Sequence, residues 1–193
     1  MKLIMASSNK NKILEIKNML SNIEILSLND IGYSNEIEEN GSSFEENAFI
    51  KAKTIYDIYH IPVISDDSGL CVNALNGEPG IYSHRYAGDE CDDAKNNQLL
   101  IKRLKNIIDR SAYYKCAICY YDGEPHYFTG IINGTIVDIP CGSNGFGYDP
   151  YFYIEHLNKT MAQLTMEEKN KISHRHIATK KLGEYLNELF SNI

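Results

Sequence analysis

The chain has 193 residues, of which 43% are hydrophobic and 23% are charged, as is typical of a soluble globular protein with a sizeable core. Its net charge of −7 argues against a general nucleic-acid coat or an anionic membrane surface, because both require clustered positive charge. No apolar stretch approaches bilayer length, and the N-terminal apolar run is too short for a signal peptide. We therefore expect one domain over residues 1–193, located in the cytoplasm, with neither nucleic acid nor a membrane as partner.

The first twenty residues predict a strand, a polar turn and a helix. Residues 2–9 supply the strand and the turn, and residues 10–20 predict a helix capped by Asn9. Lys10 and Lys12 fall in the first helical turn, where cations oppose the helix dipole. A bound phosphate would remove this conflict, since free N–H groups at a helix N-terminus attract anions. The alternative is a solvated first turn with lysines that have no ligand.

A second strand is predicted at residues 24–28, followed by a polar loop over residues 29–41 that is rich in Asn and Glu. The next helix begins with a capping-box serine and runs to about Tyr59. Asn47 and Lys51 lie one turn apart on this helix, so their side chains can project together.

Two adjacent carboxylates follow the apolar run of residues 62–64, which predicts a buried strand. We expect Asp66, Asp67 and Ser68 to lie where this strand gives way to a turn. The carboxyl ends of strands are ligand sites in α/β folds, and paired carboxylates there suit Mg²⁺, which shares oxygen ligands with substrate phosphates. Considered alone, these residues favour a simple polar turn.

The central part of the chain predicts a long antiparallel meander with one helix before it. Residues 71–75 predict more strand, and a helix runs from Asp92 or Asp93 to about Ile108. Further strands and turns are predicted in the order 111–121 (strand), 122–125 (turn), 126–132 (strand), 133–134 (turn) and 135–139 (strand).

Cys116 and Cys119 form a C-x-x-C pair inside the predicted strand. Residues three apart on a strand point to opposite faces, so the two thiols should not converge on a metal or form a redox pair. The five cysteines do not suggest a disulfide framework.

The segment Cys141–Pro150 places three glycines around Phe146. Its G-x-x-G-x-G spacing differs from the dinucleotide fingerprint, but glycines permit close approach of a ligand. Phe146 could then stack on a flat ring, a contact worth about 1–3 kcal/mol in base-binding proteins. A glycine-rich surface loop is an equally good interpretation of this segment alone.

Basic residues gather near the C-terminus of this acidic chain. Thr165 and Glu168 match a capping box for a short helix within residues 161–171, and Ser173 can cap a last helix that runs to about Phe190. His174 and Arg175 fall at its first positions, close to Lys169, Lys171 and His176. As at the first helix, an anion would explain cations at a helix N-terminus. Together these features suggest a nucleotide polyphosphate with Mg²⁺, but they do not identify a reaction.

Six ordered motifs resemble the inosine triphosphate pyrophosphatase family of nucleoside triphosphate pyrophosphatases. They are Ser7–Lys12 with Glu15, Phe44–Ala48, Ser65–Leu70, Gly77–Ser83, Gly145–Pro150, and Glu168–Asn170 continuing through Ser173–Arg175. The resemblance implies a mixed α/β fold with a long, mainly antiparallel mixed sheet and flanking helices that form two lobes around a central cleft. It implies Mg²⁺-assisted hydrolysis of ITP, dITP and XTP to the monophosphate and pyrophosphate, which cleans the nucleotide pool, and a homodimer.

The resemblance also assigns residues to roles. Asp67 would be the general base and a metal ligand, supported by Asp66, and Glu38 would be the second metal-associated acid, with Glu39 as the fallback. Phe146 would stack on the base. The residues that would bind substrate are Ser7, Ser8, Asn9, Lys10, Asn11, Lys12, Ser68, Phe146, Gly147, Tyr148, Asp149, Lys169, His174 and Arg175. Lys169, His174 and Arg175 would read the 6-keto edge, because Lys and Arg only donate hydrogen bonds.

Four positions depart from the usual family pattern. Ser7-Ser8 replaces a common Thr-Gly, His84 stands where a small residue is common, and Asn144 replaces a frequent Gly. Three other functions remain open: a Maf-like pyrophosphatase acting on other modified nucleotides, a nucleotide-binding module without turnover, and an acidic interaction protein whose motifs are incidental. The Gly-Phe-Gly-Tyr-Asp and Ser-His-Arg motifs argue against the first of these.

Overall fold

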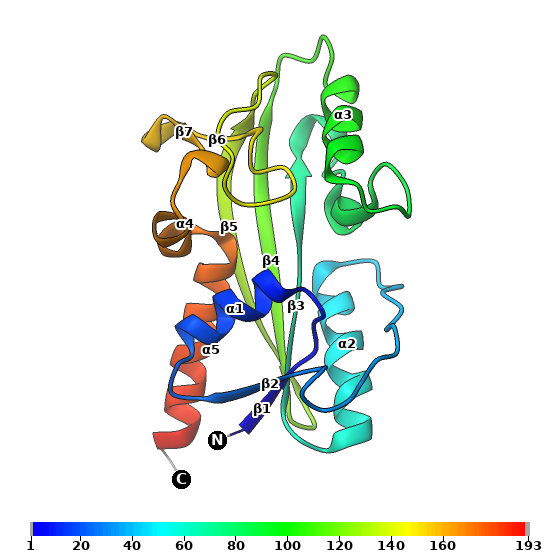
Figure 1. Ribbon diagram of the computed structural model, residues 1–193, viewed down its shortest axis with the longest axis vertical. Coiled ribbons are helices and arrows are strands. Elements are labelled where there is room, and N and C mark those ends of the chain that lie inside the picture. The colour runs from blue at the N-terminus through cyan, green and yellow to red at the C-terminus, as the bar shows by residue number, and fades with distance from the viewer. Residues whose placement is uncertain (1, 192–193) are drawn as a thin grey trace. The chain divides into compact units, whose positions relative to one another are not determined.

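The computed structural model describes residues 2–191 and has a mixed α/β architecture (Figure 1). Its strands are β1 (Lys2–Met5), β2 (Glu24–Ser27), β3 (Val63–Val72), β4 (Ser111–Tyr121), β5 (Pro125–Ile136), β6 (Phe152–Ile154) and β7 (Lys159–Thr160). Its α-helices are α1 (Lys10–Met19), α2 (Phe44–Tyr59), α3 (Asp93–Arg103), α4 (Met166–Ile172) and α5 (His174–Ser191). Four short 3₁₀ turns are η1 (Asn73–Leu75), η2 (Gly80–Arg85), η3 (Glu155–Leu157) and η4 (Met161–Gln163).

The described strands form a sheet in the order β2-β1-β3-β4-β5-β6-β7. β1 pairs in parallel with β2 and β3, whereas β6 pairs antiparallel with β5 and β7. The predicted mixed sheet with flanking helices is therefore confirmed.

The chain divides into two compact units, and each is built from separated segments. Unit 1 comprises Met1–Asp67, Cys116–Gly130 and Arg175–Ile193, and unit 2 comprises Ser68–Lys115 and Ile131–His174. The boundaries fall inside β3, β4 and β5 and at the start of α5, so both units take part of their framework from the same strands.

In unit 1 the sheet is covered on both faces. One face packs Leu3, Met5 and Ile64 against α1 and α5, and the other packs Ile4 and Val63 against α2 (Figure 1). Strand residues of odd and even number alternate between the two faces, as the geometry of a strand requires. This alternation separates Cys116 from Cys119, which lie in different core clusters as predicted.

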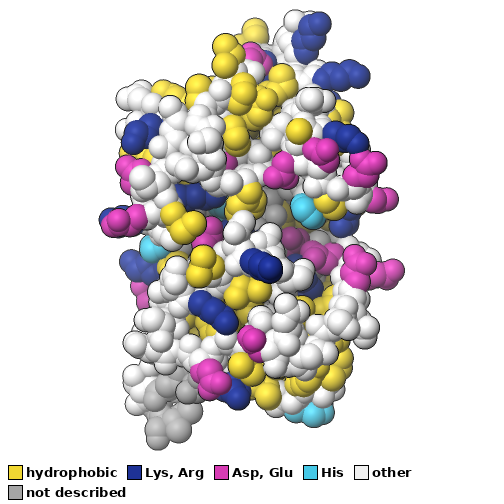
Figure 2. Space-filling view, in the orientation of Figure 1, with side chains coloured by type: hydrophobic (Ala, Val, Ile, Leu, Met, Phe, Trp, Pro, Cys, Tyr) yellow, Lys and Arg dark blue, Asp and Glu magenta, His cyan; other side chains and the backbone are white. Residues whose placement is uncertain are grey.

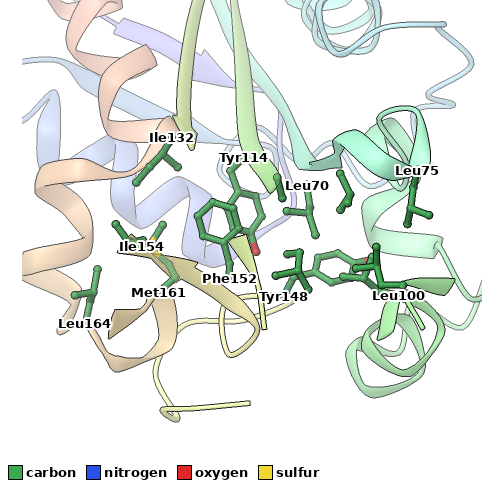
Figure 3. Packing of buried hydrophobic residues seen from close by; sticks show 14 residues of the cluster. Leu70, Leu75, Leu100, Tyr114, Ile132, Tyr148, Phe152, Ile154, Met161 and Leu164 are labelled. Atoms are coloured by element: carbon green, nitrogen blue, oxygen red, sulfur yellow. The ribbon is translucent and has the colours of Figure 1, made fainter. Parts of the chain in front are cut away.

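Unit 2 has a core of its own, in which aromatic and aliphatic side chains from β3, α3, β4, β5 and the segment from Tyr148 to Leu164 meet (Figure 3). Tyr114 and Phe152 lie at its centre with their rings 4.6 Å apart. This core supports the glycine-rich segment that contains Tyr148.

Two turns predicted from the sequence are absent from the described structure. β3 continues through Asp66, Asp67 and Ser68, and β5 continues through Asn133 and Gly134. A Cβ at position 134 would lie 2.5 Å from a backbone oxygen of β6, so this glycine permits close strand packing instead of a turn. The predicted helix end at Ile108 was also wrong. α3 ends at Arg103, and Asn106, three residues further along the chain, has a left-handed φ of 64°.

No helix within residues 2–191 is both long and apolar enough to cross a bilayer. Figure 2 shows basic and acidic side chains interspersed over the visible face, without one continuous basic surface.

Candidate active site

Asp66 and Asp67 are adjacent on β3 and point to opposite faces of the sheet in unit 1. Asp66 contacts side chains of α1 and α5, whereas Asp67 contacts α2. Both carboxylates are buried, with relative exposures of 0% and 7%. Because neighbouring strand residues alternate in direction, the two acids occupy different environments.

Asp66 lies in a buried charge network. Its Oδ2 atom is 3.0 Å from Lys12 Nζ and 3.3 Å from Arg175 Nε. Arg175 Nη1 in turn pairs with Glu15 at 2.5 Å. Burial would raise the pKa of Asp66, but Lys12, Arg175 and Lys51 together outweigh it and hold the pKa well below its usual range. Asp66 is therefore ionised at neutral pH and anchors the network.

Asp67 has the opposite electrostatic behaviour. Asn47 Nδ2 donates a hydrogen bond to Asp67 Oδ2 at 3.0 Å. Burial raises the pKa of Asp67; Lys51 and Lys12 lower it, and the nearby Glu39 raises it further. A carboxylate whose charge is disfavoured by its surroundings is a better proton acceptor, which distinguishes Asp67 from Asp66.

Lys51 joins the strand to the acidic loop and was not among the predicted site residues. Its Nζ donates to the backbone oxygen of Asp66 at 2.8 Å and pairs with Glu39 at 3.0 Å. The only sequence signal for Lys51 was its position one turn after Asn47 on α2. Among the two acids proposed as second metal ligand, Glu39 is half-buried beside Lys51, whereas Glu38 is exposed. Of these two acids, only Glu39 forms a described ion pair with Lys51.

The first turn of α1 has the predicted local structure. Asn9 caps the helix through its Oδ1, which accepts hydrogen bonds from the backbone N–H groups of Asn11 and Lys12. Residues 8–11 are exposed, whereas Lys12 reaches the buried Asp66. A cavity of about 290 Å³ lies beside this turn and includes Ser7, Ser8 and Lys10 in its lining, but not the two aspartates.

Unit 2 holds the predicted base-binding residues in a tight cluster around Asp149. Its Oδ2 accepts hydrogen bonds from Phe146 N at 3.0 Å and from Lys169 Nζ at 2.6 Å, and its Oδ1 accepts one from Tyr114 Oη at 3.3 Å. Lys169 Nζ also lies 4.8 Å from the centre of the Phe146 ring. Phe146 is 37% exposed, so its ring can serve as a stacking surface while Asp149 holds its backbone.

His174 belongs to the same unit and is held by ring stacking. Its imidazole lies 4.9 Å from the Tyr114 ring, with 10° between the planes. Since Tyr114 also contacts Asp149, one buried tyrosine connects two of the predicted base-site residues. Ser68 falls in unit 2 on β3 and is half-buried. Nothing in the sequence pattern singled out Tyr114.

Arg175 is not grouped with Lys169 and His174. It belongs to unit 1, is 2% exposed and forms ion pairs with Asp66 and Glu15. The neighbours His174 and Arg175 therefore take part in different clusters, a separation that the Ser-His-Arg motif did not reveal.

The departures from the family pattern have distinct local consequences. Asn144 Nδ2 donates to Leu164 O at 2.9 Å and its backbone N–H donates to Ala162 O, so the residue fastens the glycine-rich segment to η4. His84 is exposed, and its backbone oxygen accepts a hydrogen bond from Asn96. Ser8 is exposed beside the start of α1.

Curated relatives match this chain over nearly its full length. The dITP/XTP pyrophosphatase of Bacillus licheniformis is 48% identical over 191 residues, which cover 96% of this chain and 97% of the relative. The dITP/XTP pyrophosphatase of Thermoanaerobacter pseudethanolicus is 46% identical over 191 residues, covering 96% of each chain.

Solved structures agree with the sequence matches. The Ham1 protein of Staphylococcus aureus superposes with a TM-score of 0.92 at 43% identity, covering 97% of this chain and 99% of that one. A Ham1 protein from Coxiella burnetii also gives 0.92, at 38% identity and with the same coverage. A sequence profile of the Ham1 family matches residues 3–185, and by these three independent matches the chain belongs to the Ham1 family.

Proposed function

We propose that this chain is a nucleoside triphosphate pyrophosphatase that converts deaminated purine nucleotides, namely ITP, dITP and XTP, to the monophosphate and pyrophosphate. The single observation that carries the proposal is the asymmetry of the two aspartates. Asp66 is locked in ion pairs, while burial raises the pKa of Asp67 beside Asn47, Lys51 and Glu39. The names of the relatives, dITP/XTP pyrophosphatase, support the same substrate class.

In the proposed reaction Asp67 takes a proton from a water molecule as the water oxygen bonds to the α-phosphorus. The bond from this phosphorus to the bridging oxygen breaks, and pyrophosphate leaves with the electron pair. The exposed backbone N–H groups at the start of α1 would hold the triphosphate, because a helix N-terminus favours negative charge. Lys12 and Lys51 would add positive charge near the reacting phosphates.

Two acids of unit 1 are suitable ligands for Mg²⁺, which the substrate phosphates would bind at the same time. Within residues 2–191 there is no group of three or more His, Cys, Asp or Glu side chains arranged to enclose a metal. Mg²⁺ is commonly held by one or two carboxylates together with substrate phosphates and waters, which matches the pair Asp67 and Glu39. Bound there, Mg²⁺ would orient the triphosphate and offset its charge. Glu38, the first choice from the sequence, stays a prediction and can be compared with Glu39 by substitution.

For the purine, Phe146 would provide the stacking surface, and Gly147, Tyr148 and Asp149 would line the pocket. Lys169 has three donor positions, one of which is used by Asp149, so it can also donate to a 6-keto oxygen. The 6-amino group of ATP is a donor and would meet a donor, which explains why ATP should be rejected. Arg175 would act through Asp66, because its described ion pairs are with acids; a direct contact with the base remains a prediction.

We further propose that the protein acts as a homodimer in the cytoplasm on free nucleotides. The support for this is the family membership and the lack, within the described residues, of a helix able to cross a membrane.

A pyrophosphate-release assay with Mg²⁺ tests the proposal on ITP, XTP, dITP, ATP and GTP, with Asp67→Asn as the paired variant. Strong preference for the deaminated purines, lost in Asp67→Asn, is the expected result. Equal turnover of ATP would contradict the substrate class and would favour an enzyme for other modified nucleotides. Binding of ITP without release of pyrophosphate would favour a nucleotide-binding module.

A further inference from the structure

Two residues of α3, Asp93 in its first turn and Asn97 four positions later, hold Gly147 at both of its backbone polar atoms. Asp93 Oδ2 accepts a hydrogen bond from Gly147 N at 2.8 Å, and Asn97 Nδ2 donates one to Gly147 O at 2.9 Å. Both α3 residues and the glycine belong to unit 2. One helix therefore fixes the backbone of Gly147, the residue that follows the proposed stacking residue Phe146.

The sequence of α3 explains why these two side chains act together. Asp92 caps the helix by accepting hydrogen bonds from Ala94 N and Lys95 N, so Asp93, the first helical residue, reaches outward to the loop. Asn97 lies four residues later and therefore on the same helix face. Its Nδ2 also donates to the backbone oxygen of Asp93 at 2.8 Å, which fixes the orientation of the amide.

Asn97 occupies a position that is poorly suited to a polar side chain. It is 8% exposed, and its Oδ1 has no hydrogen-bond partner in the described structure. A buried amide oxygen without a partner is unfavourable, and an apolar residue there would avoid that cost. The bond from Nδ2 to Gly147 is the feature that offsets it.

Gly147 benefits from this external support because glycine has more backbone freedom than any other residue and does not fix the loop conformation by itself. Its φ of +63° lies in the left-handed region, where glycine is favoured, and a Cβ would meet no atom within 4 Å. Glycine suits this position because of its φ angle and not because another group packs closely against it. The loop conformation therefore depends on the two hydrogen bonds from α3 together with the Asp149 contacts.

We propose that Asp93 and Asn97 are positioning residues that hold the loop of residues 145–149 so that Phe146 and Lys169 receive the purine. This inference rests on the proposed function, because it takes Phe146 as the stacking residue. The pair acts on the affinity for the base and leaves the phosphate chemistry in unit 1 unchanged.

The test measures kcat, KM and product inhibition for ITP in Asn97→Leu and Asp93→Ala. Losing one hydrogen bond of this kind should raise KM about threefold to tenfold while kcat changes less than twofold. Inhibition by inosine monophosphate should weaken by the same factor, and inhibition by pyrophosphate, which has no base, should not change. Asp93→Asn keeps an acceptor for Gly147 N and should restore near-normal KM. Gln98→Leu, an exposed position on α3, is the matched control.

Unchanged KM and unchanged inosine monophosphate inhibition in both folded variants would overturn the positioning role. A parallel loss of affinity for both products would also overturn it, because it would indicate general damage to the fold. Failure of the wild-type chain to hydrolyse ITP would overturn the proposed function instead. In that case calorimetric binding of inosine monophosphate to the same variants still decides whether the α3 pair positions the loop.

Discussion

Asn47 connects the buried Asp67 carboxylate to the acidic loop that precedes α2. Its Nδ2 donates to Asp67 Oδ2 at 3.0 Å, and its Oδ1 accepts a hydrogen bond from Gly41 N at 2.9 Å. A Cβ at position 41 would lie 2.8 Å from that same Oδ1, so glycine is required for the loop to come this close. One amide, 1% exposed, therefore fixes both the Asp67 carboxylate, the proposed base, and the end of the segment that carries Glu39.

Asn47→Leu should lower kcat by about 10- to 100-fold, the usual effect of removing a residue that orients a site carboxylate. KM for ITP should change little, because Asn47 contacts neither α1 nor the loop of residues 145–149 through any described hydrogen bond. Steady-state kinetics at saturating Mg²⁺ measures both constants, and Asn18→Leu on the exposed face of α1 is the control. A normal kcat in folded Asn47→Leu would show that Asp67 is held adequately by other groups.

The two adjacent aspartates should respond in opposite ways to the same substitution. Asp66→Asn removes the partner of the half-buried Lys12 and of the buried Arg175, and breaking a buried pair from one side costs about 3–5 kcal/mol of unfolding free energy. Asp67→Asn removes a charge that burial disfavours, so stability should be unchanged or slightly higher while turnover is lost.

Urea unfolding of both variants, followed by circular dichroism, provides the comparison. Asp57→Asn, which breaks only an exposed pair with Lys53 on α2, should cost less than about 1 kcal/mol and serves as the control. If Asp67→Asn proved as destabilising as Asp66→Asn, the distinction between an anchoring and a reacting carboxylate would be wrong.

Local patterns in the sequence predicted most helices, but not the course of β3. The capping box at Thr165 and Glu168 and the cap at Asn9 both depend on residues within four positions, and both have the predicted geometry. Asp66-Asp67-Ser68 resembled a turn because nothing local shows that Lys12 and Arg175 would neutralise a charge inside the sheet.

Long-range partners also explain the residues that were missed. Lys51 becomes a site residue only when α2 packs beside β3, and Tyr114 only when β4 lies under the glycine-rich segment. Asp93 and Asn97 precede Gly147 by 54 and 50 positions in the chain. Such pairs depend on the topology of the whole fold, so local patterns in a single sequence do not reveal them.

The two cysteines Cys119 and Cys141 should differ strongly in reactivity at neutral pH. Burial raises the pKa of Cys119 to about 12, so at pH 8 only about one molecule in ten thousand carries the thiolate that reacts. Cys141 is exposed and should be alkylated first. Because the pKa of Cys119 is raised, its small reactivity should increase as pH rises toward 12.

Iodoacetamide labelling of the native chain, followed by peptide mass spectrometry, distinguishes the two sites. Cys141→Ser should remove the fast adduct, and labelling in urea should make the two thiols react at similar rates. Equally fast labelling of Cys119 in the native chain would show that the core cluster around α2 opens readily.

Gly145→Ala should impair recognition of the base without affecting the phosphate site. A Cβ at this position would lie 2.0 Å from Asp149 Oδ2, the atom that accepts hydrogen bonds from Phe146 N and Lys169 Nζ, and the φ of +78° is itself unfavourable for alanine. Asp149 must therefore move, and the Phe146 ring and the Lys169 ammonium lose their common support. KM for ITP should rise at least tenfold, while inhibition by pyrophosphate stays near its original strength.

The matched control is Gly123→Ala in unit 1, where φ is +124° and a Cβ would meet only Tyr56 Oη at 3.7 Å. This variant carries a similar backbone penalty in the unit that does not contain Asp149, so it separates loss of stability from loss of base recognition. If both variants weakened ITP equally, the effect at Gly145 would come from reduced stability. A rise in KM confined to Gly145→Ala would instead identify the Asp149 carboxylate as the support on which Phe146 and Lys169 depend.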